Sequence, residues 1–123
     1  MITLATLAKA TPQEVFDQSA NHLLKQNKPA AVKNNRCRYR VGPHLKCAAG
    51  CFIADSEYSE KMEGQQWRSL TIDGLAPIAH GYLIANLQNI HDNYPVNTWP
   101  ERLKNLADSL GLEFNAKTAA QAL

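Results

Sequence analysis

The feature of the sequence that most constrains its fold is a strongly delimited helical segment near the N-terminus. The run Thr11-Pro12-Gln13-Glu14 has the composition of a helix start, because threonine caps, proline suits the first turn and the glutamate completes a capping box. Apolar residues then recur at helical spacing as far as Leu24. Asn27-Lys28-Pro29 ends the pattern, since a residue before proline disfavours the helical conformation. The pattern predicts a helix over residues 12–26.

Two more helices are expected in the second half of the chain. One runs from Leu75 to about residue 94, with a proline tolerated in its first turn. The other covers 99–110, where Thr98-Trp99-Pro100-Glu101 repeats the capping-box pattern and Gly111 suits a left-handed helix end. Residues 65–74 are expected to form a loop or a short extended piece. The apolar stripes predict a core that includes Phe16, Leu24, Ile53, Leu83, Leu87, Leu103 and Leu106.

Between the helices lies a segment with the alternation of a β-strand. Over residues 36–41, arginines alternate with Cys37, Tyr39 and Val41, and this period of two is typical of a strand. Gly42-Pro43-His44 predicts a turn, after which residues 45–47 can pair back. At 123 residues, the chain is too short for two independent cores. We therefore expect one α+β domain over residues 1–123, mostly helical with a small two-stranded β-hairpin, and flexible tails at 1–10 and 115–123.

The charge of the chain is strongly polarised. Between Asp17 and Asp55 there are seven basic residues and no acidic one, whereas the rest of the chain carries six basic and eleven acidic residues. Such polarity bears on partners more than the net charge of +2 does. The predicted partner-binding residues are Lys33, Arg36, Arg38, Arg40 and Lys46. We expect the three arginines to lie side by side in solvent, on the strand face opposite the core.

Three cysteines and a histidine occur within fifteen residues, in the pattern Cys37-x6-His44-x2-Cys47-x3-Cys51. Zinc takes four such ligands, although only the Cys47-x3-Cys51 spacing fits a usual ligand pair. Buried structural thiols are the alternative, and no cofactor is then needed. A nucleophilic Cys47 beside Lys46 is a further alternative, with His44, His80 or His91 as the base. On that reading the protein would be a small cysteine- or metal-dependent enzyme.

The sequence also bears on location. Its longest uncharged apolar stretch, residues 47–54, is far shorter than a membrane span. The apolar run at the N-terminus is followed rather than preceded by its first basic residue, Lys9, which is the wrong order for a secretory signal. An odd number of cysteines is a poor disulfide framework. We therefore expect a cytoplasmic protein with no membrane partner.

Several short elements resemble a group of uncharacterised small proteins from phage and prophage genomes. Lys46-Cys47-Ala48-x-Gly50 is the most specific of them. The others are Val15-Phe16-Asp17 with His22-Leu23-Leu24, Cys37-x-Tyr39-Arg40, Asp55-x-x-Tyr58, Met62-Glu63-Gly64, Leu87-x-x-Ile90-His91-Asp92, and Trp99 with Leu103 and Leu106. The resemblance covers about residues 12–112 and implies no catalytic role. It implies a small accessory protein made in a bacterial host cell.

Size and setting together favour a protein that acts by binding a host macromolecule. A host protein, such as an enzyme or a defence component that it inhibits, is the expected partner. Nucleic acid bound through the Arg36, Arg38 and Arg40 face is the alternative, because three cations on one strand face match phosphate spacing.

Overall fold

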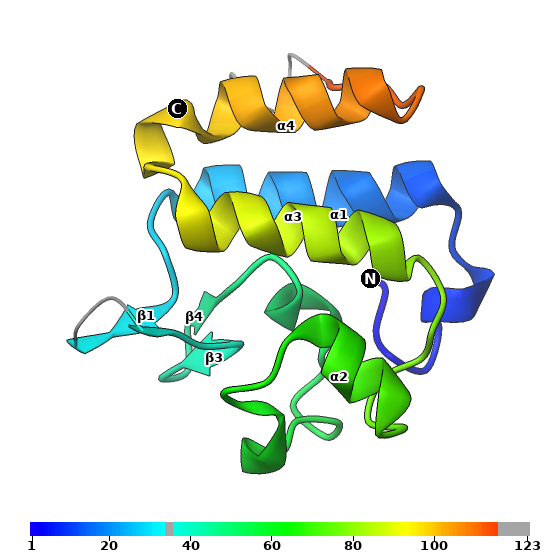
Figure 1. The fold of residues 1–123 in the computed structure, drawn as a ribbon, viewed down its shortest axis with the longest axis vertical. Helices are drawn as coiled ribbons and strands as arrows, with labels where there is room; N and C mark the ends of the chain where they lie inside the picture. The colour runs from blue at the N-terminus through cyan, green and yellow to red at the C-terminus, as the bar shows by residue number, and fades with distance from the viewer. Residues whose placement is uncertain (34–35, 116–123) are drawn as a thin grey trace.

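The computed structural model describes residues 1–33 and 36–115 and has an α+β fold, as predicted. Its helices are α1 (Pro12–Gln26), α2 (Trp67–Ile72), α3 (Gly81–Asn93) and α4 (Trp99–Ser109), joined by single turns of 3-10 helix at Leu7–Lys9, Gly50–Phe52, Glu60–Met62 and Val96–Thr98. In Figure 1, α1 and α3 lie side by side, α4 runs along one side of this pair, and α2 and the strands lie on the other. No helix in the described part of the chain is long and apolar enough to cross a bilayer.

Helix α1 confirms the predicted range and the predicted cap. The Thr11 hydroxyl accepts a hydrogen bond from the Glu14 amide, and the Glu14 carboxylate accepts one from the Thr11 amide. The backbone N–H of Thr11, followed by the Thr11 side chain, lowers the pKa of the Glu14 carboxylate. The helix ends at Asn27, which adopts the left-handed conformation before the proline. Both ends of α1 are therefore fixed by local sequence.

Helix α4 also confirms its predicted range, but its first turn is not capped in the predicted way. The Thr98 hydroxyl donates to the Pro95 carbonyl and does not cap α4, so the predicted capping box is wrong. The preceding 3-10 turn, Val96–Thr98, leads directly into α4. At the far end, Gly111 is left-handed (φ 69°) and the Leu112 amide donates to the Ala107 carbonyl at 2.8 Å, as a glycine helix end requires.

The region between residues 65 and 81 differs from the prediction in two ways. Residues 67–72 form α2, which was expected to be loop, and bury Trp67 and Leu70. Helix α3 begins at Gly81 rather than at Leu75, because His80 adopts a left-handed conformation (φ 60°) that breaks the helical path. The His80 side chain holds this corner in place through Nε2, 2.8 Å from the Ala10 carbonyl oxygen.

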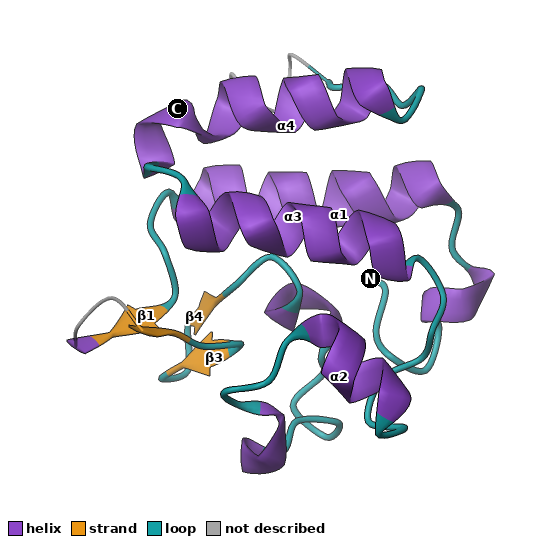
Figure 2. Ribbon diagram, in the orientation of Figure 1, coloured by secondary structure: helices purple, strands orange, loops and turns teal. Residues whose placement is uncertain are grey.

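The expected hairpin is present at residues 40–46, and a second small ladder lies beside it in the chain. Strands β1 (Ala31–Val32) and β2 (Arg36–Cys37) pair antiparallel, as do β3 (Arg40–Val41) and β4 (Leu45–Lys46). Figure 2 shows both ladders on the side of the molecule away from α4. The predicted strand is interrupted at Tyr39, whose side chain is buried and whose hydroxyl donates to the Gln65 carbonyl at 2.6 Å.

The core contains every predicted residue except one. Phe16, Leu24, Ile53, Leu83, Leu87 and Leu103 are buried, whereas Leu106 is only half-buried at the edge. The centre is filled by Ala48, Ala49 and Phe52 beneath α1, where the Ser19 hydroxyl donates to the Ala48 carbonyl.

The N-terminal segment is docked and is not the expected tail. Leu7 is fully buried, and the Ile2 amide and carbonyl both bond the Gln18 side chain. The Glu57 carboxylate accepts from the amides of Leu4 and Ala5. Of the other expected tail, residues 116–123 lie outside the described residues.

Candidate functional site

The predicted basic face is divided by the fold into paired and unpaired cations. Arg38 lies 3.2 Å from the Glu60 carboxylate and 3.7 Å from that of Glu63, and Arg40 lies 2.9 Å from the Asp55 carboxylate. The side chain of Arg38 is 30% exposed and that of Arg40 is 18% exposed. The prediction of three solvent-facing arginines is therefore wrong for these two.

The carboxylates that pair with Arg38 and Arg40 also accept hydrogen bonds from other groups. The Glu63 carboxylate also accepts the backbone N–H groups of Tyr39 and Arg40, and the Tyr58 hydroxyl at 2.7 Å. The guanidinium of Arg40 stacks on the Tyr58 ring, 4.5 Å from its centre. The hydrogen bond to Glu60 is the main cause of a raised Arg38 pKa. Burial, followed by the Glu63 contact, raises the pKa of Tyr58 to about 12. This network fixes the link between β2 and β3.

The other five cations of the basic segment have no ion pair among the described residues, and we call this set the basic surface. Lys33 and Arg36 are exposed on the β1–β2 hairpin. The rest of the set lies at the end of α1 and on β4, and its members are Lys25, Lys28 and Lys46.

An open groove of about 660 Å³, which we call the basic groove, crosses this surface. Two lysines, Lys25 and Lys28, stand on its α1 side, and the β3–β4 hairpin forms the opposite side. That side is apolar apart from one imidazole, with Val41, Pro43, His44 and Leu45 in the lining. Apolar side chains beside a polar rim are the arrangement of many protein-binding surfaces.

His22 anchors this groove to the core. Its ring nitrogen Nε2 lies 2.8 Å from the Lys46 carbonyl oxygen, so this nitrogen donates and carries the proton of the neutral ring. Burial is the main cause of a lowered His22 pKa, and the positive charge of Lys46 and the neighbouring His91 add to it. His22 is therefore held neutral between α1 and β4.

This lowered pKa predicts a pH dependence of folding. Because the unfolded chain binds a proton on His22 near its ordinary pKa of about 6.5 and the folded chain binds it only at lower pH, acid favours unfolding. We expect the melting temperature to be level above about pH 6.5 and to fall below it, before the carboxylates titrate near pH 4.5. His22→Gln, whose amide keeps a donor for the Lys46 carbonyl, should flatten this part of the profile. An unchanged slope in the variant would assign the effect to another group.

The four predicted metal ligands are not brought together. The Cys47 thiol is fully buried and accepts the Gly50 amide at 3.2 Å, while the Cys51 thiol donates to the Ala48 carbonyl at 3.2 Å. His44 is exposed on the basic groove, and Cys37 faces α3. Among the described residues, this possible set of zinc ligands does not form one group.

The buried thiols are also poor nucleophiles. Burial raises the pKa of Cys47 far above its usual value and that of Cys51 to about 12. Since the thiolate is the reactive form, neither thiol is activated at neutral pH. Cys47, the possible nucleophile of the enzyme alternative, is part of the core, where its sulfur accepts the Gly50 amide.

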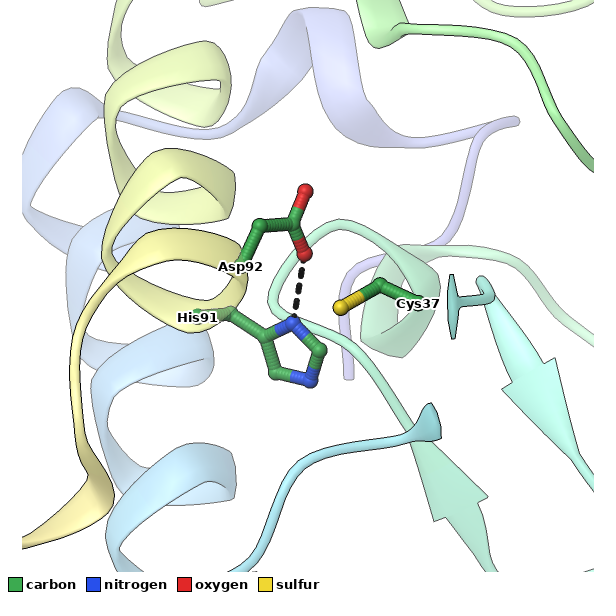
Figure 3. A group of neighbouring side chains, drawn as sticks. All are labelled: Cys37, His91 and Asp92. Atoms are coloured by element: carbon green, nitrogen blue, oxygen red, sulfur yellow. Dashed lines mark hydrogen bonds and ion pairs between the residues drawn. The ribbon is translucent and has the colours of Figure 1, made fainter. Parts of the chain in front are cut away.

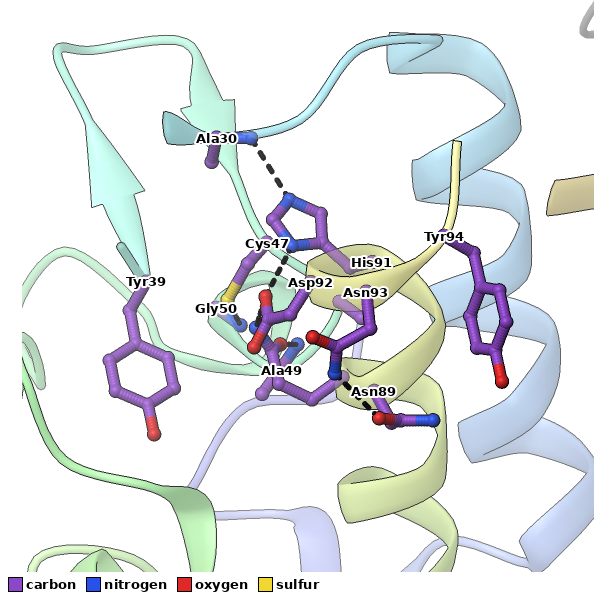
Figure 4. A network of polar contacts seen from close by, with 12 residues as sticks. Ala30, Tyr39, Cys47, Ala49, Gly50, Asn89, His91, Asp92, Asn93 and Tyr94 are labelled. Carbon is purple, nitrogen blue, oxygen red and sulfur yellow. Dashed lines mark hydrogen bonds and ion pairs between the residues drawn. The ribbon is translucent and has the colours of Figure 1, made fainter. Parts of the chain in front are cut away.

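A different cluster, which the spacing did not predict, consists of Cys37, His91 and Asp92. Their potential ligand atoms all lie within 4.8 Å of one another, and Figure 3 shows the Cys37 sulfur directed toward the pair on α3. His91 Nδ1 donates to the Asp92 carboxylate at 2.7 Å, and its Nε2 accepts the Ala30 amide at 2.9 Å. Figure 4 shows that both ring nitrogens are engaged.

These hydrogen bonds decide what the cluster can do. The Ala30 N–H requires a lone pair on Nε2, so the neutral ring carries its proton on Nδ1 and offers no second lone pair to a metal or a thiol. Burial and the Asp92 charge raise the pKa of Cys37 to about 11. The cluster therefore acts as a structural joint: His91 is buried, stacks near Trp99 and satisfies a buried backbone donor.

The last candidate is a cleft of about 410 Å³ between α3 and the residues that lead into α2. One wall contains Gln65, Gln66, Trp67 and Arg68, and the other is a face of α3 with Gln88, Asn89 and Asn93. We call it the carboxamide groove. Its lining shares no residue with the basic groove. Nothing in our sequence analysis pointed to it, although amides at 88, 89 and 93 fall on one helical face.

The chain matches no protein-family model, no curated protein and no solved structure.

Proposed function

We propose that this protein acts by binding an acidic surface of a partner protein through the basic surface. The observation that carries the proposal is the absence of ion pairs at Lys25, Lys28, Lys33, Arg36 and Lys46 in the described part of the chain. No acidic residue lies between Asp17 and Asp55 to neutralise these cations locally. Complementary charge on a partner would steer association and fix its orientation.

The surroundings of these cations favour protein over nucleic acid. Proteins that bind single strands stack bases on exposed aromatic rings. Here Tyr39 is buried, and the Tyr58 ring is covered by the Arg40 guanidinium. The groove beside Lys25 and Lys28 instead offers apolar contacts on the β3–β4 hairpin, which suit an apolar side chain of a protein.

The resemblance to phage and prophage proteins supports the setting that we propose for this binding. The protein would act in the cytoplasm of a bacterial host cell as a small accessory protein. Its partner would be a host protein, such as an enzyme or a defence component that it inhibits. Within this proposal, Arg38 and Arg40 are not contact residues but rigid supports for the hairpins.

Affinity capture from a nuclease-treated bacterial lysate tests this proposal. We expect the triple variant Lys25→Gln, Lys28→Gln and Arg36→Gln to lose most of the captured partner at an unchanged melting temperature, because these cations form no ion pair within residues 1–33 and 36–115. The matched control is Lys9→Gln, Lys61→Gln and Lys104→Gln, which removes equal charge elsewhere and should retain the partner. Capture that disappears with nuclease alone would favour the nucleic-acid alternative.

A second variant separates binding from stability. Arg38→Gln with Arg40→Gln should lower the melting temperature, because it leaves the Glu63 and Asp55 carboxylates without their guanidinium partners. Partner capture below the melting temperature should persist. If this pair abolished capture while the triple variant did not, the contact surface would lie on the acidic network instead.

A further inference from the structure

The carboxamide groove has hydrogen-bonding groups that the fold does not use. Gln88 is fully engaged, since its oxygen accepts the Ala49 amide and its nitrogen donates to Asp92. Asn93 donates to the oxygen of Asn89 at 2.6 Å, and the Asn89 nitrogen and the Asn93 oxygen have no hydrogen-bond partner among the described residues. Figure 4 shows this pair on α3, one turn apart. Gln66, on the opposite wall, makes no side-chain hydrogen bond within the described residues.

A buried donor without an acceptor adjoins these groups. Trp67 lines the groove, and its indole Nε1 has no hydrogen-bond partner in the described chain, although the atom is buried. The second tryptophan differs, because the Trp99 indole donates to the Tyr94 carbonyl at 3.1 Å. An unpaired buried N–H is unfavourable, so a ligand carbonyl that reached the Trp67 indole would gain a hydrogen bond that the fold leaves unmade.

The spacing along α3 fits one kind of ligand. Residues four apart on a helix are separated by about 6 Å along the axis. In an extended peptide, main-chain groups that point the same way recur every two residues, or about 6.6 Å. The Asn89 nitrogen can therefore donate to a peptide carbonyl, and the Asn93 oxygen can accept a peptide N–H on the same edge of one extended strand.

An unpaired positive charge in the groove indicates that the peptide carries an acidic side chain. The lining contains two arginines and two carboxylates. Arg38 is paired with Glu63, and Asp92 accepts hydrogen bonds from His91 and Gln88. Arg68 is exposed and has no ion pair among the described residues. A carboxylate on the peptide would form a bidentate ion pair with the Arg68 guanidinium, through two parallel hydrogen bonds.

We propose that the carboxamide groove binds an extended peptide segment of a protein, held by its main chain on Asn89 and Asn93, with an acidic side chain directed to Arg68. The proposal does not depend on the basic surface, whose residues are different. A planar heterocycle such as a nucleoside would use the same amides, and the test below includes it as a competing outcome.

The probes are pools of acetylated and amidated tetrapeptides, each with glutamate fixed at one position, added to the full-length protein labelled with nitrogen-15. We expect at least one pool to shift the Trp67 indole resonance and the amides of residues 85–93, while the Trp99 indole stays in place because its hydrogen bond is already made. Replacing glutamate by lysine in that pool should weaken binding by about tenfold or more.

Two kinds of change then test main-chain recognition. Asn89→Ala with Asn93→Ala should weaken peptide binding by about tenfold, whereas Asn86→Ala, one turn earlier on α3 and outside the groove lining, should not. Methylating the peptide nitrogens should abolish binding, because it removes the donors. Three results would each overturn the proposal: no shift with any pool at about 10 mM, equal binding of methylated peptides, or binding of adenosine or uridine without binding of peptides.

Discussion

Gly50→Ala is expected to cost about 3 kcal/mol of folding free energy or more. A Cβ at this position would collide with the backbone carbonyl of Tyr39. That carbonyl already accepts the Cys47 amide at 3.2 Å, so it cannot move without breaking the bond that joins the hairpins to the core. Against a typical total stability of 5–15 kcal/mol, such a loss should lower the melting temperature by roughly 10 °C or more.

The matched control for Gly50→Ala is Gly81→Ala. A Cβ at Gly81 meets no atom within 4 Å, and the residue opens α3. Alanine there should be neutral or stabilising by up to about 1 kcal/mol. Thermal and urea unfolding measure both variants. A Gly50→Ala protein as stable as the parent would show that the 47–53 turn can move away from Tyr39, contrary to the close packing described above.

The parts of the fold that sequence predicted well are those with local signals at both ends. Helix α1 has a cap and a proline-defined end within its own sequence, and α4 ends at a glycine that must be left-handed. Helix α2 lacked such signals: it has six residues and no side-chain cap, and burial of Trp67 and Leu70 holds it. The start of α3 was misplaced for a similar reason, since the left-handed His80 depends on a contact with Ala10, seventy residues away.

The candidate sites show the same division between local and long-range information. Alternation correctly placed Tyr39 inward and Arg36 outward. It could not show that Arg38 and Arg40 find carboxylates from residues 55–63, because those contacts depend on how the chain folds back. Without them, three exposed arginines were the simplest reading of the pattern.

The cysteines illustrate the limit of ligand spacing as a guide. Cys37, Cys47 and Cys51 are close in sequence, yet their thiols point to different surroundings. The group that does meet Cys37 comes from α3, more than fifty residues later. Its His91 is committed to a backbone amide of Ala30, so proximity of a thiol, an imidazole and a carboxylate does not by itself make a reactive site here.

Helix α3 carries both the core and the carboxamide groove on different faces, which makes Leu87 the most informative core residue. Its side chain is fully buried, in a helix that packs against α1, α2 and α4. Leu87→Ala is expected to cost about 2–5 kcal/mol, because it removes buried methyl groups and leaves a cavity that the surrounding helices cannot close. Urea unfolding of the variant measures this cost directly.

Leu106 is the comparison for Leu87 because it is the same residue type, only half-buried, on α4. Leu106→Ala should cost clearly less, since solvent already reaches its side chain and less apolar area is lost from the core. Equal costs for the two variants would mean that α4 presents a different face to the core. A cost below about 1 kcal/mol for Leu87→Ala would place α3 itself wrongly. In that case Asn89 and Asn93, which share its turns, could not form the proposed peptide-binding wall.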